Sequence, residues 1–117
     1  MKLNQNNAGL AAEKLAATFL TQRGLKLGMQ NYHCRFGEID LIIKEGEVLV
    51  FIEVRLRTNR LFDLAAESIS AKEQQKIIQT AKHFLMQHGE HSCRFDTILM
   101  DKADQQHIEW IRHAFET

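Results

Sequence analysis

GEIDLIIKEGEVLVFIEVRLR, the stretch from Gly37 to Arg57, holds two runs of branched apolar residues separated by a polar segment with one glycine. The first run, Glu38–Ile43, and the second, Val48–Arg57, have the composition of β-strands. Lys44–Glu47 lies between them, and its Gly46 can take the left-handed backbone that tight hairpin turns require. The stretch therefore predicts a β-hairpin, against which the rest of the chain must pack.

Helical patterns flank this hairpin on both sides. Apolar residues recur at helical spacing over about Ala8–Arg23, and Gly24 is placed to end that helix. A second helix is expected to begin near Ser70, because Ser70 and Glu73 have the spacing of a capping box. Gly89 is its expected stop.

Shorter strand signals complete the order of elements, near Lys26–Tyr32, Phe95–Met100 and Ile108–Ile111. A helix, a hairpin, a second helix and two strands predict an α/β (α+β) fold, with a central mixed sheet flanked by helices. The chain shows no linker and no internal repeat, so residues 1–117 are expected to form a single domain.

Composition excludes several classes of protein. The 117 residues are 44% hydrophobic and 26% charged, which is typical of a globular domain and not of a disordered chain. The longest apolar run, Val48–Ile52, is far shorter than the roughly 20 residues of a membrane span. The N-terminal residues have no apolar signal core, and two cysteines do not make a disulfide framework. We therefore expect a cytoplasmic protein with reduced thiols.

The charges balance, with 15 Lys and Arg against 15 Asp and Glu, which argues against general attraction to phosphate. A local basic patch remains, because Arg55, Arg57 and Arg60 lie close together in the sequence. Lys72 falls in the first turn of the second helix, where anions are favoured. Arg57, Arg60 and Lys72 are candidate nucleic-acid contacts, and solvated side chains or surface ion pairs are the alternative.

The hairpin also carries candidate chemistry. Because side chains alternate along a strand, Asp40, Glu53 and Arg55 are expected to project from one face. A two-residue turn at Glu45–Gly46 predicts that Asp40 faces Phe51, which leaves Asp40 and Glu53 on a diagonal with Cα atoms about 7–8 Å apart. Two carboxylates at that separation can meet on one Mg²⁺ or Mn²⁺, since such cations take oxygen ligands.

A metal ion held in this way activates water and neutralises phosphate charge, so the pattern predicts hydrolysis of phosphodiesters. Arg55 would then contact the phosphate oxygen or the attacking water. The alternative is an exposed strand face whose acids and bases form ion pairs that only stabilise the sheet. The other face of the hairpin is expected to be buried and consists of Ile39, Leu41, Ile43, Val50, Ile52, Val54 and Leu56.

The two blocks of the hairpin resemble the hallmark of the YraN-like family of small, uncharacterised bacterial proteins. GEIDLI at Gly37–Ile42 and LVFIEVRLR at Leu49–Arg57 carry the resemblance, and Gly9 with Glu13 is similar to the family's Gly-x-x-x-Glu start. Similar residues occur along most of the chain, at Gly24, Asn31, Arg35, Lys72, Arg94-Phe95-Asp96 and Ala114-Phe115.

That family in turn resembles the PD-(D/E)xK nuclease superfamily, which has a restriction-endonuclease-like core and includes the archaeal Holliday junction resolvases. The resemblance implies a Mg²⁺ or Mn²⁺ site on Asp40 and Glu53, with Glu13 as the helix-borne acid and Arg55 as a further catalytic residue. Without it, Glu13 would be interpreted as a solvated helix residue. It also implies DNA as substrate, branched or structured DNA included, and a homodimer by analogy with the resolvases.

Arg55 departs from this pattern, because the superfamily motif has lysine at that position. Arginine stays protonated and cannot act as a general base, although it can bind a phosphate with two hydrogen bonds. An alternative function follows, in which the chain keeps a nuclease fold but only binds DNA or a DNA-processing partner.

Overall fold

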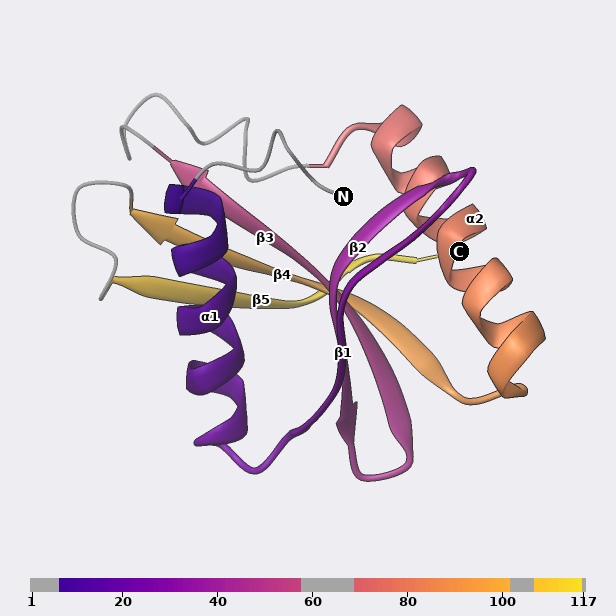
Figure 1. The fold of residues 1–117 in the computed structure, drawn as a ribbon, viewed down its shortest axis with the longest axis horizontal. Helices are drawn as coiled ribbons and strands as arrows, with labels where there is room; N and C mark the ends of the chain where they lie inside the picture. The colour runs from indigo at the N-terminus through magenta and orange to yellow at the C-terminus, as the bar shows by residue number, and fades with distance from the viewer. Residues whose placement is uncertain (1–6, 58–68, 102–106, 117) are drawn as a thin grey trace.

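The computed structural model describes residues 7–57, 69–101 and 107–116, without the side chains of residues 7, 8 and 57 (Figure 1). Its elements are α1 (Asn7–Thr21), β1 (Lys26–Cys34), β2 (Gly37–Glu45), β3 (Val48–Arg57), α2 (Ala71–His88), β4 (Cys93–Asp101) and β5 (Ile108–Phe115). The strands form one sheet in the order β1-β2-β3-β4-β5, in which β3 and β4 are parallel and the other neighbours antiparallel. The predicted mixed sheet with flanking helices is confirmed.

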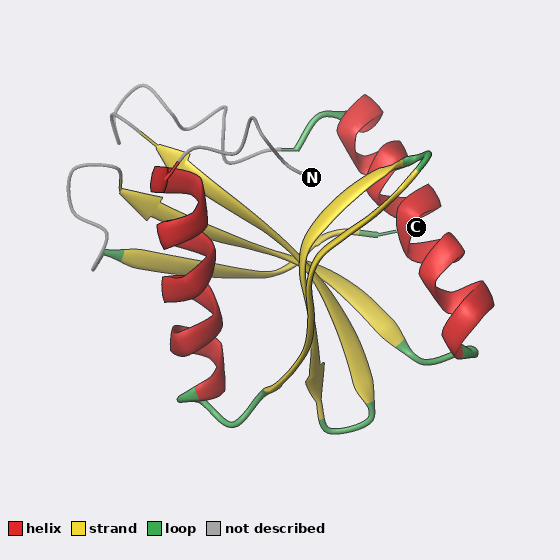
Figure 2. Cartoon of the chain, viewed as in Figure 1, coloured by secondary structure: helices red, strands yellow, loops and turns green. Residues whose placement is uncertain are grey.

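The two helices cover different sets of sheet residues, and Figure 2 shows them standing apart with strands between them. On α1, Ala12, Ala16, Ala17 and Leu20 pack with Leu41, Ile43, Val50, Ile52, Ile98 and Met100. On α2, Ile77, Ile78, Ala81 and Phe84 pack with Ile39, Ile42, Leu49, Phe51, Phe95 and Phe115. Each helix therefore has its own hydrophobic core.

The second core corrects two expectations about the hairpin. Ile42 and Phe51 lie on the face that was expected to be polar, yet both are buried on the α2 side. Ile39 was expected beside Leu41 and Ile43, but it packs in the α2 core while they pack in the α1 core. The simple alternation fails at Asp40, between Ile39 and Leu41.

The turn between β2 and β3 is Gly46–Glu47, so the predicted Glu45–Gly46 turn is wrong by one residue. Gly46 has φ 61° and takes the first position of the turn, where a left-handed residue suits a two-residue hairpin. Phe51 consequently pairs with Ile42 and not with Asp40. A shift of two partners preserves the alternation of faces within the paired region, where Leu41, Ile43, Val50 and Ile52 all pack in the α1 core.

β2 and β3 diverge beyond this paired region. Their backbone pairing runs from the turn as far as Leu41 and Ile52 and ends there. β2 then approaches α2, where a Cβ on Gly37 would lie 3.1 Å from Oγ1 of Thr80. Figure 1 shows β1 and β2 curving together toward α2 while β3 continues beside β4. The divergence brings both helices close to the end of the β2–β3 ladder.

The edge strand β1 is irregular at two places. Its pairing with β2 shifts between Leu27 and Met29, so that Gly28 is an extra residue. Asn31 has a left-handed backbone with φ 55°, which is uncommon outside glycine.

The predicted capping box at the start of α2 is confirmed. The backbone N–H of Glu73 donates to Oγ of Ser70 at 3.2 Å, and Oε1 of Glu73 accepts from the backbone N–H of Ser70. The helix also ends at Gly89 as predicted, with φ 88°. In the described residues, no helix has both the length and the apolar character needed to cross a membrane.

Candidate functional site

Asp40 lies just beyond the last backbone pair of β2 and β3. At this position its carboxylate, and not its backbone, bonds to β3. Its Oδ2 accepts a hydrogen bond of 2.8 Å from the backbone N–H of Val54. One step beyond the Leu41–Ile52 pair, the same register places Glu53 opposite Asp40. The predicted pairing of Asp40 with Phe51 is therefore wrong, and the two acids lie just beyond the last backbone pair, where the charge of Glu53 acts on Asp40.

Glu13 reaches the same place from α1. It is only 8% exposed, although the residues on either side of the buried stripe of a surface helix usually face water. Its side chain hydrogen-bonds Asp40, and its charge acts on both Asp40 and Glu53. The structure thus brings together the three acids of the predicted site, from three different elements.

Burial and nearby negative charges raise the pKa values of Asp40 and Glu53. The pKa of Asp40 is raised to about 8, first by burial and then by the charge of Glu53. The pKa of Glu53 is raised to about 7, chiefly by burial, while the nearby charge of Arg55 lowers it and those of Glu73 and Glu13 raise it. The cluster therefore holds protons near neutral pH that a bound cation would displace. Perturbed acids of this kind gather at functional sites.

Arg55 is held by an acid that the sequence pattern did not connect to the site. Its Nη2 donates to Oε2 of Glu73 at 2.5 Å, across 18 residues of sequence. The other oxygen of Glu73 accepts from Ser70 in the capping box. Glu73 therefore links the first turn of α2 to Arg55. The Ser-x-x-Glu spacing signals only the local contact, so the longer one could not be read from it.

Of the predicted nucleic-acid contacts, Lys72 is the one whose side chain is described. It is exposed in the first turn of α2, next to Glu73. Arg57 ends β3, but its side chain lies outside the described residues, as does all of Arg60. Lys76 is exposed one turn further along α2 and extends the positive surface that begins at Lys72.

The donor set fits a hard divalent cation. Mg²⁺ prefers oxygen ligands, usually takes one or two protein carboxylates, and keeps several waters. Asp40 and Glu53 supply that number. Across residues 7–57, 69–101 and 107–116, no group of three or more His, Cys, Asp or Glu side chains forms a ready-made metal site. The arrangement matches a water-rich magnesium site better than a closed zinc site, which needs four protein ligands.

Two residues that neighbour the central acids in the sheet have a buried oxygen with no hydrogen-bond partner in the part of the chain that the structure describes. Oγ1 of Thr97 is one, on a fully buried residue of β4 that pairs directly with Glu53 of β3. Oδ1 of Asn31 on β1 is the other. Asn31 lies opposite Asp40, because both of its chain neighbours pair with the neighbours of Asp40. Unsatisfied polar atoms therefore lie next to each of the two central acids.

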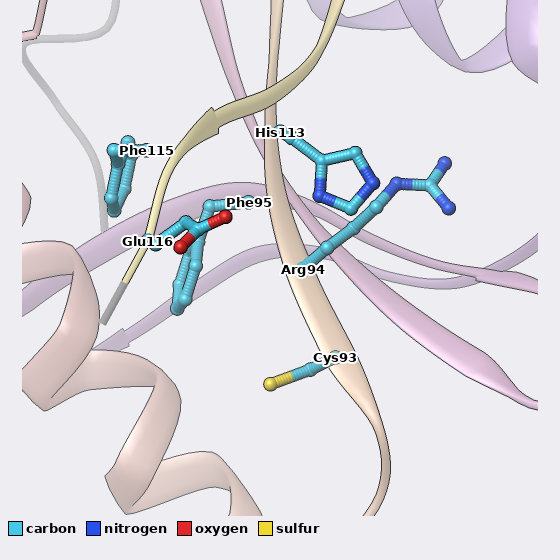
Figure 3. A pocket seen from close by; sticks show the side chains of 6 residues that line it. All are labelled: Cys93, Arg94, Phe95, His113, Phe115 and Glu116. Carbon is cyan, nitrogen blue, oxygen red and sulfur yellow. The ribbon is translucent and has the colours of Figure 1, made fainter.

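A separate cavity of about 300 Å³ lies where β4 begins and β5 ends (Figure 3). It is lined by Cys93, Arg94, Phe95, His113, Phe115 and Glu116, none of which belongs to the predicted site. Figure 3 shows the guanidinium of Arg94 directed away from the two phenylalanines. Arg94 donates to Glu45 at 2.6 Å and to Asp96 at 3.0 Å. Its positive charge is therefore paired with two acids of the sheet and does not face the cavity.

Comparison with known proteins matches residues 12–100 to the family described as "Uncharacterised protein family UPF0102". A UPF0102 protein of Methylobacillus flagellatus is 53% identical over 104 residues, which cover 89% of this chain and 92% of the relative. One from Nitrosomonas europaea is 50% identical over 111 residues, covering 94% of each chain. One from Psychromonas ingrahamii is 48% identical over 112 residues, covering 95% and 91%. The family match spans the whole acidic cluster.

Proposed function

This chain belongs to the UPF0102 family of uncharacterised bacterial proteins, the YraN-like family that its hairpin resembles, and we propose that it is a Mg²⁺- or Mn²⁺-dependent endonuclease acting on DNA. The observation that carries the proposal is the convergence of Glu13, Asp40 and Glu53 on one largely buried site. A mixed sheet between two helices supports a restriction-endonuclease-like core.

In this proposal Asp40 and Glu53 hold the cation, which supplies a polarised water and neutralises charge on the phosphate when bound. The N–H of Val54 keeps the Asp40 carboxylate in place, so little reorganisation is needed on binding. Glu13 shares a hydrogen bond with Asp40 and orients the attacking water.

Arg55 contacts a phosphate oxygen of the substrate. It already binds the carboxylate of Glu73, and a phosphate offers the guanidinium the same paired acceptors. Because arginine does not give up its proton, Arg55 stabilises negative charge and leaves proton transfer to the acids.

DNA, branched or structured DNA included, is the proposed substrate. Lys72 lies beside the Arg55–Glu73 pair and contacts the DNA backbone, with Arg57 and Arg60 following from β3. We further propose a homodimer, since cutting both strands of a branched substrate needs two sites. A cytoplasmic location is supported by Cys34 and Cys93, both free thiols.

The contact of Arg55 also favours a second function. Arg55 stands in the position of the motif lysine and forms its ion pair with an acid of the same chain. A chain that keeps this pair when DNA binds would dock to DNA or to a DNA-processing partner without cutting.

Calorimetry of Mn²⁺ and Mg²⁺ binding tests the proposal, with wild type compared with the Asp40→Asn, Glu53→Gln double variant. Glu47→Gln, which removes a charge from the exposed turn, is the matched control. We expect binding in wild type and in the control, and none in the double variant. Wild type and the control should cleave four-way-junction or supercoiled DNA, and the double variant should not. DNA binding that persists in EDTA, with no cleavage under either cation, supports the second function instead.

A further inference from the structure

Asn31 distorts the sheet at the level of the acidic cluster. Its φ of 55° interrupts the β1–β2 pairing at the position opposite Asp40. Asparagine tolerates this left-handed backbone better than most residues, but glycine would adopt it with less strain. The left-handed backbone explains why either Asn or Gly suits this position. It does not explain why the residue is Asn, with its amide side chain, and not Gly.

The amide oxygen of Asn31 is buried and has no hydrogen-bond partner within residues 7–57, 69–101 and 107–116. Leaving a buried acceptor in that state carries the cost of its desolvation without the gain of a hydrogen bond. Such groups in native proteins usually have a water or an ion as partner. Oγ1 of Thr97, whose residue pairs with Glu53 in the sheet, is also buried without a hydrogen-bond partner among the described residues.

A cavity of about 330 Å³ is lined by Leu10, Ala11, Glu13, Lys14, Gln30 and Asn31. Its walls come from α1 and β1 and include both Glu13 and Asn31. Glu13 hydrogen-bonds Asp40, and Asn31 lies across the strand pair from Asp40. Asn31 therefore borders the acidic cluster through two independent neighbours.

We propose that Asn31 supplies a neutral oxygen ligand to the divalent cation held by Asp40 and Glu53. The inference rests on the proposed function, because it adds a residue to the same site. A neutral donor suits this position, since a further carboxylate would increase the repulsion among the acids. Amide and carboxylate oxygens are both accepted by Mg²⁺ and Mn²⁺.

Substitution by glycine separates this role from a purely conformational one. Asn31→Gly keeps the left-handed backbone, relieves its strain and removes only the amide. His113→Gly is the matched control, because His113 has a φ of 52° on β5 and lines the separate cavity. Asn31→Asp keeps an oxygen and a residue type that tolerates this backbone, but replaces the amide nitrogen.

The measurements are the Kd of Mn²⁺ by calorimetry and the Tm with and without Mn²⁺. We expect Asn31→Gly to weaken Mn²⁺ binding by about tenfold or more, at an unchanged or higher metal-free Tm. Asn31→Asp should bind Mn²⁺ at least as tightly as wild type, with a lower metal-free Tm from the added repulsion. His113→Gly should bind like wild type.

Each other outcome is decisive. Wild-type affinity in Asn31→Gly overturns the role of Asn31 and leaves the proposed cation site intact. Loss of binding in both Asn31→Gly and Asn31→Asp overturns the oxygen-ligand assignment, because the amide nitrogen would then be the needed group. If wild type itself binds no Mn²⁺, the proposed metal site fails together with the role of Asn31.

Discussion

The backbone N–H of Val54 on β3 donates to the Asp40 carboxylate on β2 at 2.8 Å, at the point where the two strands separate. One hydrogen bond thus ends the strand pairing and holds an acid of the candidate site. The stability of the protein should therefore change differently when Asp40 loses only its charge and when it loses the oxygen that accepts this hydrogen bond.

Asp40→Asn removes the charge but keeps an oxygen that can accept from Val54. We expect the metal-free variant to be as stable as wild type or more stable at pH 8, because it lacks the repulsion with Glu53. Asp40→Ala should lose about 1 kcal/mol or more, since the partly buried N–H of Val54 would lose its partner. Urea unfolding of both variants checks the pair, and equal losses in the two would contradict it.

The stability of the metal-free protein should fall as pH rises. The pKa of Asp40 is raised from 3.8 to about 8 and that of Glu53 from 4.5 to about 7, so the folded state holds protons that the unfolded state releases. Their contribution is complete below about pH 4 and is lost as pH rises through about 7 to 8. The loss should be on the order of a few kcal/mol.

Thermal unfolding in EDTA between pH 5 and about 9 measures this fall. The Asp40→Asn, Glu53→Gln double variant should show a flatter profile over the same range. A wild-type profile as flat as that of the double variant would show that these acids ionise without penalty.

Glu73→Gln should release Arg55 toward the substrate. Glutamine still fits the third position of a capping box, so α2 should keep its start, while the ion pair is lost. We expect DNA affinity at low salt to rise a few-fold, because a negative charge is removed from the binding surface. Glu47→Gln serves as the control for a change in net charge, and equal gains in both variants would make the effect nonspecific.

Arg55→Lys restores the lysine of the nuclease motif. A lysine amine can contact the phosphate and can shift its pKa, which a guanidinium cannot. We expect cleavage at least equal to that of wild type in Mn²⁺, whereas Arg55→Ala should lose tenfold or more. Cleavage of four-way-junction DNA under single-turnover conditions checks this, and full activity in Arg55→Ala would remove Arg55 from the site.

Thr97→Val should stabilise the protein by about 1 kcal/mol, because it replaces a buried hydroxyl that has no partner among the described residues with a methyl group of similar shape. Thr80→Val is the matched control. Thr80 is equally buried, but its hydroxyl donates to the backbone oxygen of Lys76 at 2.7 Å, so its removal should not stabilise. Urea unfolding compares the two, and a gain in both would point to packing alone.

The sequence predicted those parts of the structure that depend on contacts between residues close together in the chain. The hairpin arms, the Ser70–Glu73 capping box and the stop at Gly89 all follow from neighbours within a few residues. Glu13 and Asp40 meet because α1 packs on β2. The family resemblance implies this contact, but no spacing of residues in the sequence predicts it.

The errors arise where two local solutions are equally good or where tertiary packing decides. Gly46 can occupy either position of a two-residue turn, so the sequence pattern placed the turn one residue early. β5 extends to Phe115, beyond the predicted end at Ile111, because Phe115 pairs with Phe95 across an irregularity at which the backbone N–H of His113 donates to the Asp96 carboxylate. The Arg55–Glu73 contact joins a strand to a helix that follows much later, so no local pattern reports it.

The irregular edge of β1 also bears on assembly. An uninterrupted edge strand offers a row of backbone donors and acceptors to which another chain can add as a further strand. Here the extra residue at Gly28 and the left-handed Asn31 break that row twice within a short length, although Leu27 and Met29 expose apolar side chains nearby. The edge is therefore a poor template for aggregation, and two copies of this chain should associate through a surface other than β1.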